Sequence, residues 1–510
     1  MNAKLSIKPD LATANRIDRQ PKVVIVGAGM SGILSAIRLR EMGMENIVVL
    51  EKADRIGGTW RDNTYPGLSC DVPAHMYTYS FAGNPEYSHR FAKGPEIFAY
   101  FDRVSKEYGI DKIIRFNSEV TDAVYCNGQW QLKTLAGDEL QADIVLCATG
   151  VLHEPRYPKI DGLDSFAGEK WHTARWNHDV DISGKRVAVI GTGSTATQIV
   201  STITEKVGKL TLFQRSAQWI YPLFDRHYTE KHKERLRKDL SMTKKLHDRY
   251  QLAFNQFFPK LVTGNKFVQW LVSWTCKRHL ESKVKNPILR EKLRPDYQAG
   301  CKRLIIANGF YEAIQSDNAE LVTEGIQRIE PQGIRTADGQ LRECDVLVLA
   351  TGFHAHNFMR PMNMTGINDI TLDEAWSKCA FAHKTVTVPG FPNVFLLTGP
   401  NSPIGNFSLI GINELQLDYI TQLVEQWTSG KADEIEPKME LTMEYNKKLQ
   451  NSMGHTIWVT GCKSWYFDEF GRLAMWPWSM NKFRQEMAAP KLEEFDLRKL
   501  STDADVSAGL

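Results

Sequence analysis

Residues 22–51 read KVVIVGAGMSGILSAIRLREMGMENIVVLE. The apolar, β-branched run at 22–26 predicts a buried strand, and the apolar residues at helical spacing from 33 to 42 predict a helix. A second strand is expected at 46–50, directly before an acidic residue. Strand, glycine-rich turn, helix and parallel strand together make the βαβ unit. The sequence therefore predicts an α/β fold that begins with a nucleotide-binding module.

The turn of this unit carries Gly27, Gly29 and Gly32 in the pattern G-x-G-x-x-G. The first glycine permits the tight turn, the second lets the backbone approach a pyrophosphate, and the third lets the helix pack closely on the strand. The helix N-terminus then offers free N–H groups to the anion. Glu51 lies 24 residues after Gly27, where an acid binds the ribose hydroxyls. We predict a site for a dinucleotide without a 2′-phosphate, such as FAD.

A second module of the same kind follows at 186–215, RVAVIGTGSTATQIVSTITEKVGKLTLFQR. Its glycine motif has the G-x-G-x-x-A form, with Gly191, Gly193 and Ala196. The residue 24 positions after Gly191 is Arg215, which would pair with a 2′-phosphate that an acid would repel. This unit is therefore predicted to bind NADPH, although Arg215 taken alone could be a solvated surface charge. Further candidate contacts with NADPH are Ser194, Thr195 and Ser216.

Two buried strands, at 142–147 and 344–349, each end in Ala-Thr-Gly downstream of one module. The chain can cross between two domains at such points, and prolines follow the first of them, as is typical of a rigid linker. We predict an α/β protein with two Rossmann-like dinucleotide-binding domains, for FAD and NADPH, and a helical insertion in the NADPH domain. The expected FAD domain is 1–152 and 385–510 with a loose C-terminal tail, the NADPH domain is 153–217 and 295–384, and the insertion is 218–294.

The predicted insertion is rich in charge at 227–250 and in aromatic residues at 252–275. Its basic residues are interleaved with leucine at helical spacing. A helix lying on a membrane surface is one interpretation of this pattern. An amphipathic helix of a soluble protein has the same pattern, and we favour it. The 13 Trp and 23 Phe of the whole chain suggest aromatic-lined cavities, although plain core filling is the interpretation we favour.

Charge and composition exclude several classes of protein. The 510 residues include 63 Lys and Arg against 60 Asp and Glu, so there is no basic footprint for nucleic acid. No apolar run is long enough for a membrane span, and residues 1–20 lack the apolar segment of a signal peptide. The eight cysteines are scattered without a CxxC pair, which argues against a zinc site and against a disulfide framework. We expect a cytoplasmic protein with reduced, buried thiols and no metal.

Two turn-rich segments carry further candidates. In the first, Gly57 and Gly58 precede Thr59 and Trp60. Paired glycines indicate a close approach to the backbone, and a tryptophan can wall a flat ring system, although an ordinary turn is the alternative. In the second, Asp71 lies among turn formers, where a lone Asp most often only shapes the turn.

Together these motifs resemble those of the two-nucleotide flavoprotein monooxygenases. Residues 166–176, FAGEKWHTARW, also match F-x-G-x-x-x-H-x-x-x-W, the signature of the Baeyer–Villiger monooxygenases. The tryptophan that ends it separates them from amine- and sulfide-oxidising relatives, whereas Asn177 replaces the Pro or Asp that comes next in the family. The resemblance covers about residues 20–490. The signature positions here are Phe166, Gly168, His172 and Trp176.

The resemblance implies roles for individual residues. Arg303 would be the catalytic residue beside the flavin, and Asp71 would pair with it. Lys302 would grip a phosphate of the cofactor, and Trp465 would contact the nicotinamide ribose and the substrate. His172 would couple the domains and take no part in the chemistry, which agrees with its interpretation as a structural histidine. Candidate FAD contacts are Thr59, Trp60 and Tyr77.

The implied reaction inserts one atom of O₂ beside a ketone carbonyl to give an ester or lactone. NADPH reduces a non-covalently bound FAD, oxygen adds at flavin C4a, and the peroxide attacks the ketone while a fixed cation stabilises the anionic species. The substrate would be a small ketone, whose identity the sequence does not specify, nor does it specify the oligomeric state.

Three alternatives remain open at this point. An N- or S-oxygenating flavoprotein is disfavoured by Trp176 and by the Lys302–Arg303 pair. A disulfide reductase or electron-transfer flavoprotein would carry a CxxC motif or a partner surface, and the sequence has no CxxC. A binding protein without activity is disfavoured by the intact glycine motifs and by the retention of Asp71 and Arg303.

Overall fold

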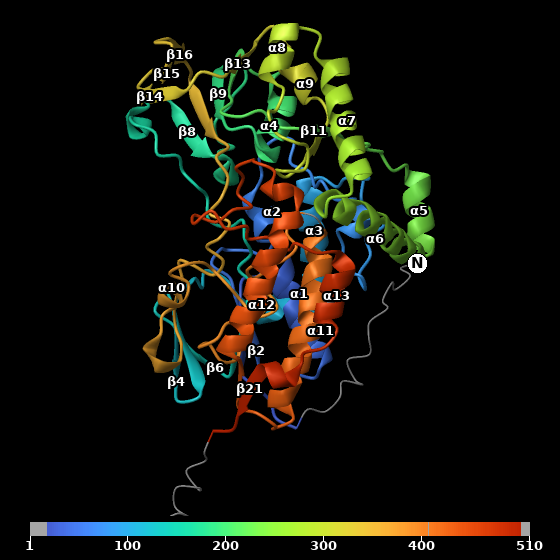
Figure 1. Cartoon of the computed structure of the whole chain (residues 1–510), viewed down its shortest axis with the longest axis vertical. Helices are drawn as coiled ribbons and strands as arrows, with labels where there is room; N and C mark the ends of the chain where they lie inside the picture. Colours follow the sequence, from blue (N-terminus) through green and yellow to red (C-terminus); the bar gives the residue numbers. More distant parts are fainter. Residues whose placement is uncertain (1–17, 406, 501–510) are drawn as a thin grey trace, which may run out of the picture.

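The computed structural model describes residues 18–405 and 407–500. Most of the N-terminal segment and the expected tail at 501–510 lie outside the described residues. Two parallel five-stranded sheets dominate the chain, one in each half of the molecule (Figure 1). The predicted α/β class with two nucleotide-binding modules and a helical insertion is confirmed.

The first sheet contains the module of residues 22–51. Its strand order is β19 (Val394–Leu396), β7 (Ile144–Cys147), β1 (Val23–Val26), β2 (Ile47–Leu50) and β3 (Ile114–Arg115). Helix α1 (Met30–Glu41) begins three residues earlier than its apolar periodicity indicates. The reason is that Gly32 packs within the first turn, where a Cβ would lie 1.8 Å from the carbonyl oxygen of Gly27. The first turn of α1 is therefore formed by the motif itself, and its glycine carries no apolar side chain that the periodicity could record.

The second sheet contains the second module. Its strand order is β13 (Ala319–Val322), β10 (Lys209–Phe213), β9 (Arg186–Ile190), β17 (Val346–Leu349) and β8 (Glu169–His172). Helix α4 (Ser194–Ile203) follows β9 and packs its apolar face into the second core. Both central strands, β1 and β9, are rich in β-branched residues and almost entirely buried, as expected for parallel strands covered on both faces.

The two connections between the sheets lie side by side. Pro155 and Phe353 form an isolated antiparallel bridge, and the N–H of Arg156 donates to the carbonyl oxygen of Gly352 at 2.9 Å. Gly150 and Gly352, which end the two Ala-Thr-Gly segments, have φ values of +75° and +81°. Glycine is needed at both points because side chains rarely adopt this left-handed backbone. The chain therefore crosses between the halves at two adjacent glycine turns, as the repeated motif predicts.

The predicted insertion is helical, and it covers one side of both halves (Figure 1). Its helices are α5 (Glu230–Lys238), α6 (Ser241–Val262), α7 (Lys266–Lys283) and α8 (Pro287–Lys292). Its first residues are not helical: β11 (Ile220–Pro222) pairs in parallel with β12 (Ile305–Ala307). This pairing brings the two ends of the insertion together beside the second sheet.

The aromatic residues of α7 are not core residues, which corrects the interpretation favoured from the sequence. Phe267, Trp270 and Trp274 are 68%, 58% and 48% exposed. The buried face of α7 is instead the small apolar stripe at 268, 272, 276 and 280, one residue per turn. These residues are buried in the two cores: Val268, Val272 and Cys276 in the first and Leu280 in the second. Within the described residues, none of the helices is long and apolar enough to cross a membrane.

The chain returns to the first half earlier than the predicted boundary at 384. Strand β18 (Asn363–Thr365) pairs with β4 (Val120–Cys126), which belongs with β5 (Gln129–Thr134) and β6 (Glu139–Ala142). Phe358 and Trp376 are buried in the same core as the first sheet. We therefore propose that the second part of the first domain begins just after β17. Pairing between strands so far apart in the chain has no local signal in the sequence.

The remaining elements complete the two halves. The first half contains α2 (Thr59–Asp62), η2 (Ala74–Met76), α3 (Gly94–Glu107), α10 (Leu372–Ala375), α11 (Leu409–Thr428), α12 (Met439–Ser452), η8 (Ile457–Val459), α13 (Met480–Met487), β20 (Glu434–Pro437) and β21 (Phe495–Arg498). The second half contains α9 (Phe310–Ala313), β14 (Ile326–Glu330), β15 (Gly333–Thr336) and β16 (Leu341–Glu343).

Candidate active site

A cavity of about 1790 Å³ lies between the two sheets, where the carboxyl ends of β1 and β9 open toward each other. Ligands of open α/β sheets bind at this edge of the strands. The cavity is lined by these predicted site residues: Gly27, Gly29, Glu51, Thr59, Trp60, Asp71, Tyr77, Gly191, Gly193, Ser194, Thr195, Arg215, Ser216, Lys302, Arg303 and Trp465. Gly32 and the signature residues Phe166, Gly168, His172 and Trp176 do not line it. The structure thus brings residues from both modules and from three other segments, 59–77, 302–303 and 465, into one space.

The first nucleotide motif presents a carboxylate to the cavity. Glu51, at the end of β2, is buried and accepts hydrogen bonds from the N–H groups of Ala28 and Ala53 at 2.8 and 3.0 Å. Arg61 donates to the same carboxylate at 2.7 Å. A carboxylate has about four acceptor positions, so these three bonds leave one. Glu51 is therefore fixed in place and can still accept a hydroxyl, as a ribose-binding acid must.

Arg61 is a site residue that the sequence analysis missed. It is buried, and besides Glu51 it contacts Asp62 at 2.8 Å and the carbonyl oxygen of Arg55 at 2.9 Å. Its two carboxylate partners raise the pKa of Arg61, although burial opposes them as the largest single effect. The available signal was its position, one residue after the Gly-Gly-Thr-Trp segment.

The Gly57–Trp60 segment lies against the first motif. A Cβ on Gly29 would meet Gly58 Cα at 3.6 Å, so the two glycine turns face each other across a narrow gap. Trp60 donates from its ring N–H to the hydroxyl of Tyr77 at 3.1 Å, and the two rings pack edge to face at 5.6 Å. This segment is more than an ordinary turn, because two glycine turns without side chains and two aromatic rings fixed by a hydrogen bond together line one part of the cavity.

The second motif is open toward the cavity. Gly191 has φ +117°, and a Cβ there would lie 2.3 Å from the carbonyl oxygen of Ala350. A Cβ on Gly193 would have no other atom within 4 Å, so the space beside this glycine is free for a ligand. Ser194 and Thr195 form the first turn of α4, whose N–H groups point toward the same space. The geometry fits a pyrophosphate at the start of α4.

Three polar residues gather beside this motif. Arg215 and Ser216 follow β10, and Arg215 is exposed at the cavity wall. The ammonium of Lys302 donates to Ser216 Oγ at 3.3 Å and lies 4.4 Å from the ring centre of Tyr297. Burial, and to a smaller extent the positive charge of Arg215, lower the pKa of Lys302, while Asp296 opposes this. Two cations so close together favour a bound dianion such as a phosphate.

Arg303 and Asp71 meet at the cavity wall. The guanidinium Nη2 of Arg303 donates to Asp71 Oδ2 at 2.8 Å, across 232 positions of sequence. Asp71 raises the pKa of Arg303 above its already high value, so the guanidinium stays charged. Asp71 therefore does more than shape its turn: it orients a permanent cation toward the space between the two nucleotide motifs.

Trp465 closes another side of the cavity. Its ring is half-buried and packs edge to face on Tyr466, with ring centres 4.7 Å apart. The backbone carbonyl of Trp465 accepts a hydrogen bond from His356 Nε2 at 2.8 Å. Apolar side chains complete the wall from two other parts of the chain: Phe254 and Phe258 of α6, with Phe407 and Leu409 before and within α11.

The signature residues have a different place. They surround β8, the edge strand of the second sheet, which pairs with β17. His172 is fully buried: its Nδ1 accepts from the N–H of Ala174 at 3.1 Å, so Nε2 donates to the carbonyl oxygen of Gly352 at 3.0 Å. Burial lowers the pKa of His172 to about 4. A neutral histidine tied to the crossover glycine agrees with a role in domain coupling.

The other three signature residues pack around the same strand. A Cβ on Gly168 would meet the carbonyl oxygen of Asp345 at 2.4 Å and the ring of Phe166 at 2.8 Å. Trp176 packs edge to face on Trp171 at 5.5 Å. The signature therefore describes packing at the sheet edge next to the crossover, and none of its members faces the cavity.

The expectation that every thiol is reduced is wrong for two cysteines. Cys301 and Cys462 form a disulfide, and the other six cysteines are free. The pair could not be found from spacing, because the two residues are 161 positions apart and neither belongs to a CxxC motif. Among the described residues, no cluster of His, Cys, Asp and Glu could hold a metal ion.

Comparison with known proteins agrees with this geometry. The pattern of the flavin-binding monooxygenase-like family matches residues 20–374, which is more than half of the chain. The chain belongs to this family. It is a flavin-dependent monooxygenase, and the nucleotide motifs, the signature strand and the Ala-Thr-Gly crossovers all fall within the matched region.

Individual relatives match over almost their whole length. An uncharacterised monooxygenase of Mycobacterium tuberculosis is 45% identical over 94% of this chain and 97% of its own. A Baeyer–Villiger monooxygenase of Streptomyces coelicolor is 37% identical over 96% of this chain and 94% of its own. The crystal structure of OTEMO in complex with FAD and NADP superposes with a TM-score of 0.84, at 26% identity, over 94% of this chain and 100% of that one.

Proposed function

We propose that this monooxygenase is of the Baeyer–Villiger type, binds FAD and NADPH, and converts a ketone into an ester or lactone. The observation that carries the proposal is the Arg303–Asp71 pair, a permanent cation placed between two nucleotide motifs. The relatives support it, since one is named a Baeyer–Villiger monooxygenase and another was crystallised with FAD and NADP.

The first motif fits FAD. The bare turns at Gly29 and Gly58 leave backbone N–H groups accessible to a pyrophosphate. Glu51 retains one acceptor position for a ribose hydroxyl, and its negative charge disfavours a 2′-phosphate. Trp60 and Tyr77 would flank the flavin ring system. No covalent attachment is proposed.

The second motif fits NADPH. The open space beside Gly193 and the first turn of α4 would receive the pyrophosphate. Arg215, with Lys302 and Ser216 beside it, would hold the 2′-phosphate. Trp465 lines the same cavity, and we assign it to the nicotinamide side, as the resemblance implies.

The flavin, when bound, supplies hydride acceptance and oxygen activation, which no side chain can provide. The guanidinium of Arg303 would stabilise the negative charge on the reacting oxygen atoms and on the ketone oxygen as carbon migrates. Asp71 holds this cation in one orientation, so the cation needs no rearrangement during the reaction. The apolar walls at Phe254, Phe258 and Phe407 would exclude water from the reacting groups.

The test separates flavin reduction from oxygen insertion. Arg303→Ala is expected to retain reduction by NADPH, measured by stopped-flow absorbance, and to lose ester formation by about 10²–10³-fold, because one preorganised charge is removed. Arg303→Lys keeps the positive charge but lacks the planar guanidinium with its several N–H donors, so its rate of ester formation should lie between those of Arg303→Ala and the wild type. Cyclic, linear and aryl ketones, a sulfide and an amine would be compared as substrates. Normal ester turnover in Arg303→Ala, or oxidation of only the sulfide and amine by the wild type, would overturn the proposal.

A further inference from the structure

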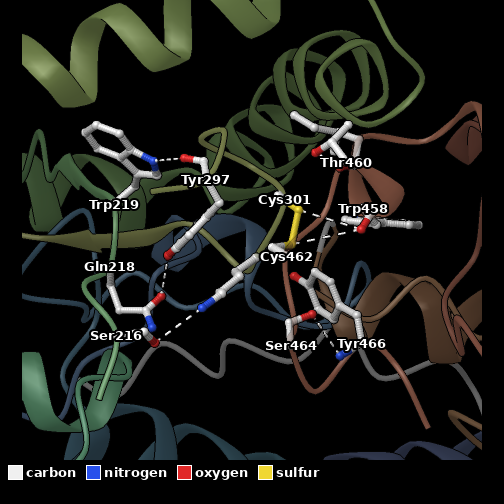
Figure 2. Close-up of a disulfide and its surroundings, with 12 residues drawn as sticks. Ser216, Gln218, Trp219, Tyr297, Cys301, Trp458, Thr460, Cys462, Ser464 and Tyr466 are labelled. Atoms are coloured by element: carbon white, nitrogen blue, oxygen red, sulfur yellow. Dashed lines mark hydrogen bonds between the residues drawn. A yellow bond between two sulfur atoms is a disulfide. The ribbon is translucent and has the colours of Figure 1, made fainter. Parts of the chain in front are cut away.

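The disulfide joins two segments that each carry residues of the candidate active site. Cys301 directly precedes Lys302 and Arg303, and Cys462 lies three residues before Trp465. The Cα atoms of the two cysteines are 6.1 Å apart. Figure 2 shows the two segments meeting at this bond. The covalent link therefore limits how far the segment that carries Trp465 can move from Lys302 and Arg303.

The segment around Cys462 is held by packing at its two ends, where Trp458 and Tyr466 are buried in the first core with ring centres 5.5 Å apart. Among the described residues, the hydrogen bonds of 459–466 are local, except the one from His356 to the carbonyl of Trp465. Residues 459–463 are exposed apart from Cys462 itself. The disulfide is thus the covalent attachment of the exposed residues 459–463, and Tyr466 anchors the chain by packing just beyond Trp465.

We propose that the Cys301–Cys462 disulfide is a thiol-exchange site for a dithiol reductant, and that its reduction releases Trp465 from the side of Lys302 and Arg303. The inference rests on the proposed function, because it concerns the NADPH and substrate side of the same cavity. Disulfides in reducing compartments are mostly catalytic or redox-sensing, and no catalytic CxxC motif is present in the sequence.

The exchange reaction begins at Cys462. Cys301 is completely buried, whereas Cys462 is 8% exposed, so a reductant thiolate would attack Cys462 Sγ. The S–S bond breaks, its electron pair goes to Cys301 Sγ, and that sulfur takes up a proton. The second thiol of the reductant then attacks the mixed disulfide and frees Cys462. The protein gains two electrons and two protons, and the reductant leaves as a disulfide.

The surroundings also suit the reduced pair. The carbonyl oxygen of Trp458 lies 3.6 Å from Cys301 Sγ and 4.0 Å from Cys462 Sγ (Figure 2). A disulfide has no proton to donate to this oxygen, but each free thiol has one. Reduction therefore creates donors next to an acceptor that is already in place, and the site can exist in both states.

Release of the segment has a defined kinetic consequence. If Trp465 occupies its position only about one-tenth of the time after reduction, the KM for NADPH rises about ten-fold. Water would also reach the cavity more easily, so less ester would form for each NADPH consumed. Hydride transfer from bound NADPH, which uses the flavin side of the cavity, is expected to change little.

The experiment is a redox titration of the wild-type holoenzyme in mixtures of reduced and oxidised dithiothreitol. Thiols counted after denaturation should rise from six to eight, since six of the eight cysteines are free. The KM for NADPH and the yield of ester per NADPH should follow the disulfide fraction on one curve. The double variant Cys301→Ser/Cys462→Ser should show the reduced values in every mixture. Cys126→Ser, which removes an exposed free thiol, should titrate like the wild type.

A second readout does not depend on catalysis. Lys463 is exposed within the tethered segment, and trypsin should cut there faster when the disulfide is reduced. If cleavage follows the redox state but no ketone gives an ester, the proposed function fails and the exchange site stands. If cleavage at Lys463, KM and coupling are the same in the oxidised and reduced enzyme, the exchange site is overturned.

Discussion

At the scale of single residues, charge placement distinguishes the two nucleotide motifs. Glu51 and Arg215 occupy equivalent positions, 24 residues after the first glycine of each module. Glu51 is buried and accepts three hydrogen bonds, whereas Arg215 is exposed at the cavity wall beside Lys302. The buried acid is preorganised for hydroxyl groups, and the exposed arginine is free to reach a phosphate.

Arg215→Ala is expected to raise the KM for NADPH and leave that for NADH nearly unchanged. A charge-assisted hydrogen bond contributes about 1.5–3 kcal/mol, which corresponds to roughly ten- to 150-fold in affinity. Steady-state kinetics with both cofactors measure this difference. Arg103→Ala changes a half-buried arginine of α3 that pairs with Glu107 and does not line the cavity, so this control should change neither value. Equal shifts for NADPH and NADH, or a wild-type preference for NADH, would remove Arg215 from the phosphate site.

Gly191 and Gly193 are expected to serve different purposes: Gly191 is needed for folding, and Gly193 is needed for binding NADPH. Gly191→Ala should lower the free energy of unfolding by about 1–3 kcal/mol, because a Cβ at φ +117° would meet a backbone oxygen at 2.3 Å. Gly193→Ala should leave unfolding unchanged, since nothing lies within 4 Å, but should raise the KM for NADPH. Urea unfolding and kinetics of both variants test this pair. Equal stability of the two variants would contradict it.

At the scale of elements, the insertion is joined to the first half through a buried histidine. His75, in η2, is 1% exposed, and neither ring nitrogen has a hydrogen-bond partner among the described residues. Its ring lies 5.4 Å from that of Tyr228 and 6.4 Å from that of His232 at the start of α5. His247 of α6 contacts the backbone carbonyl of His75 at 3.1 Å. The contact between these elements therefore depends on neutral histidines.

This arrangement predicts that stability falls in mild acid. Burial, with smaller effects of His232 and His247, lowers the pKa of His75 to about 4. The unfolded chain titrates near the ordinary value of about 6.5, so it binds more protons than the folded chain between these two pH values. The stabilising contribution is therefore complete above about pH 6.5 and declines as the pH falls toward 4.

His75→Phe should remove part of this pH dependence. The ring of His75 makes no hydrogen bond that a phenyl ring would lose, so the free energy of unfolding at pH 7 should not fall. Denaturant unfolding at about pH 5 and pH 7 gives the slope in each protein. A variant with the same slope as the wild type and lower stability at pH 7 would show that His75 is not the titrating group. His172, whose pKa is also lowered to about 4, would contribute to the slope that remains, together with the other histidines whose pKa burial lowers: His153, His232, His247 and His279.

At the scale of the whole molecule, one cavity of about 1790 Å³ separates the two halves, and its walls come from both sheets and from α6. The halves are joined by two adjacent glycine crossovers, one of which is tied to His172. A ligand that fills this space would contact both halves at once. Cofactor binding is therefore expected to stabilise the complete chain and not only one domain.

Removing FAD should lower the Tm of the protein. A ligand at about 100 times its Kd stabilises the folded state by about 2.7 kcal/mol. The flavin should be released as a yellow solute on denaturation, because its proposed site holds it by hydrogen bonds and packing alone. Thermal unfolding before and after flavin removal, followed by readdition of FAD, measures the effect. Flavin that stays on the denatured chain, or an unchanged Tm, would contradict non-covalent binding at this site.

The sequence by itself determined both nucleotide modules, the crossover strands and the helical character of the insertion. Each of these depends on patterns within a short stretch of consecutive residues: apolar periodicity, or glycines that a turn or a close contact requires. The candidate residues of the glycine motifs were therefore found directly, and the structure places most of them at the cavity wall. Gly32 instead serves the packing of α1, a role that the motif also allows.

Only the tertiary structure decided the contacts between distant segments. Arg303 and Asp71 meet across 232 positions, and the disulfide closes across 161. The same is true of β18 beside β4 and of the exposed aromatic face of α7. The physical reason is that periodicity shows that a helix or strand has an apolar face, but not which surface covers it. That choice depends on how the sheets, crossovers and insertion pack together, and it placed the cationic centre between the two nucleotide motifs.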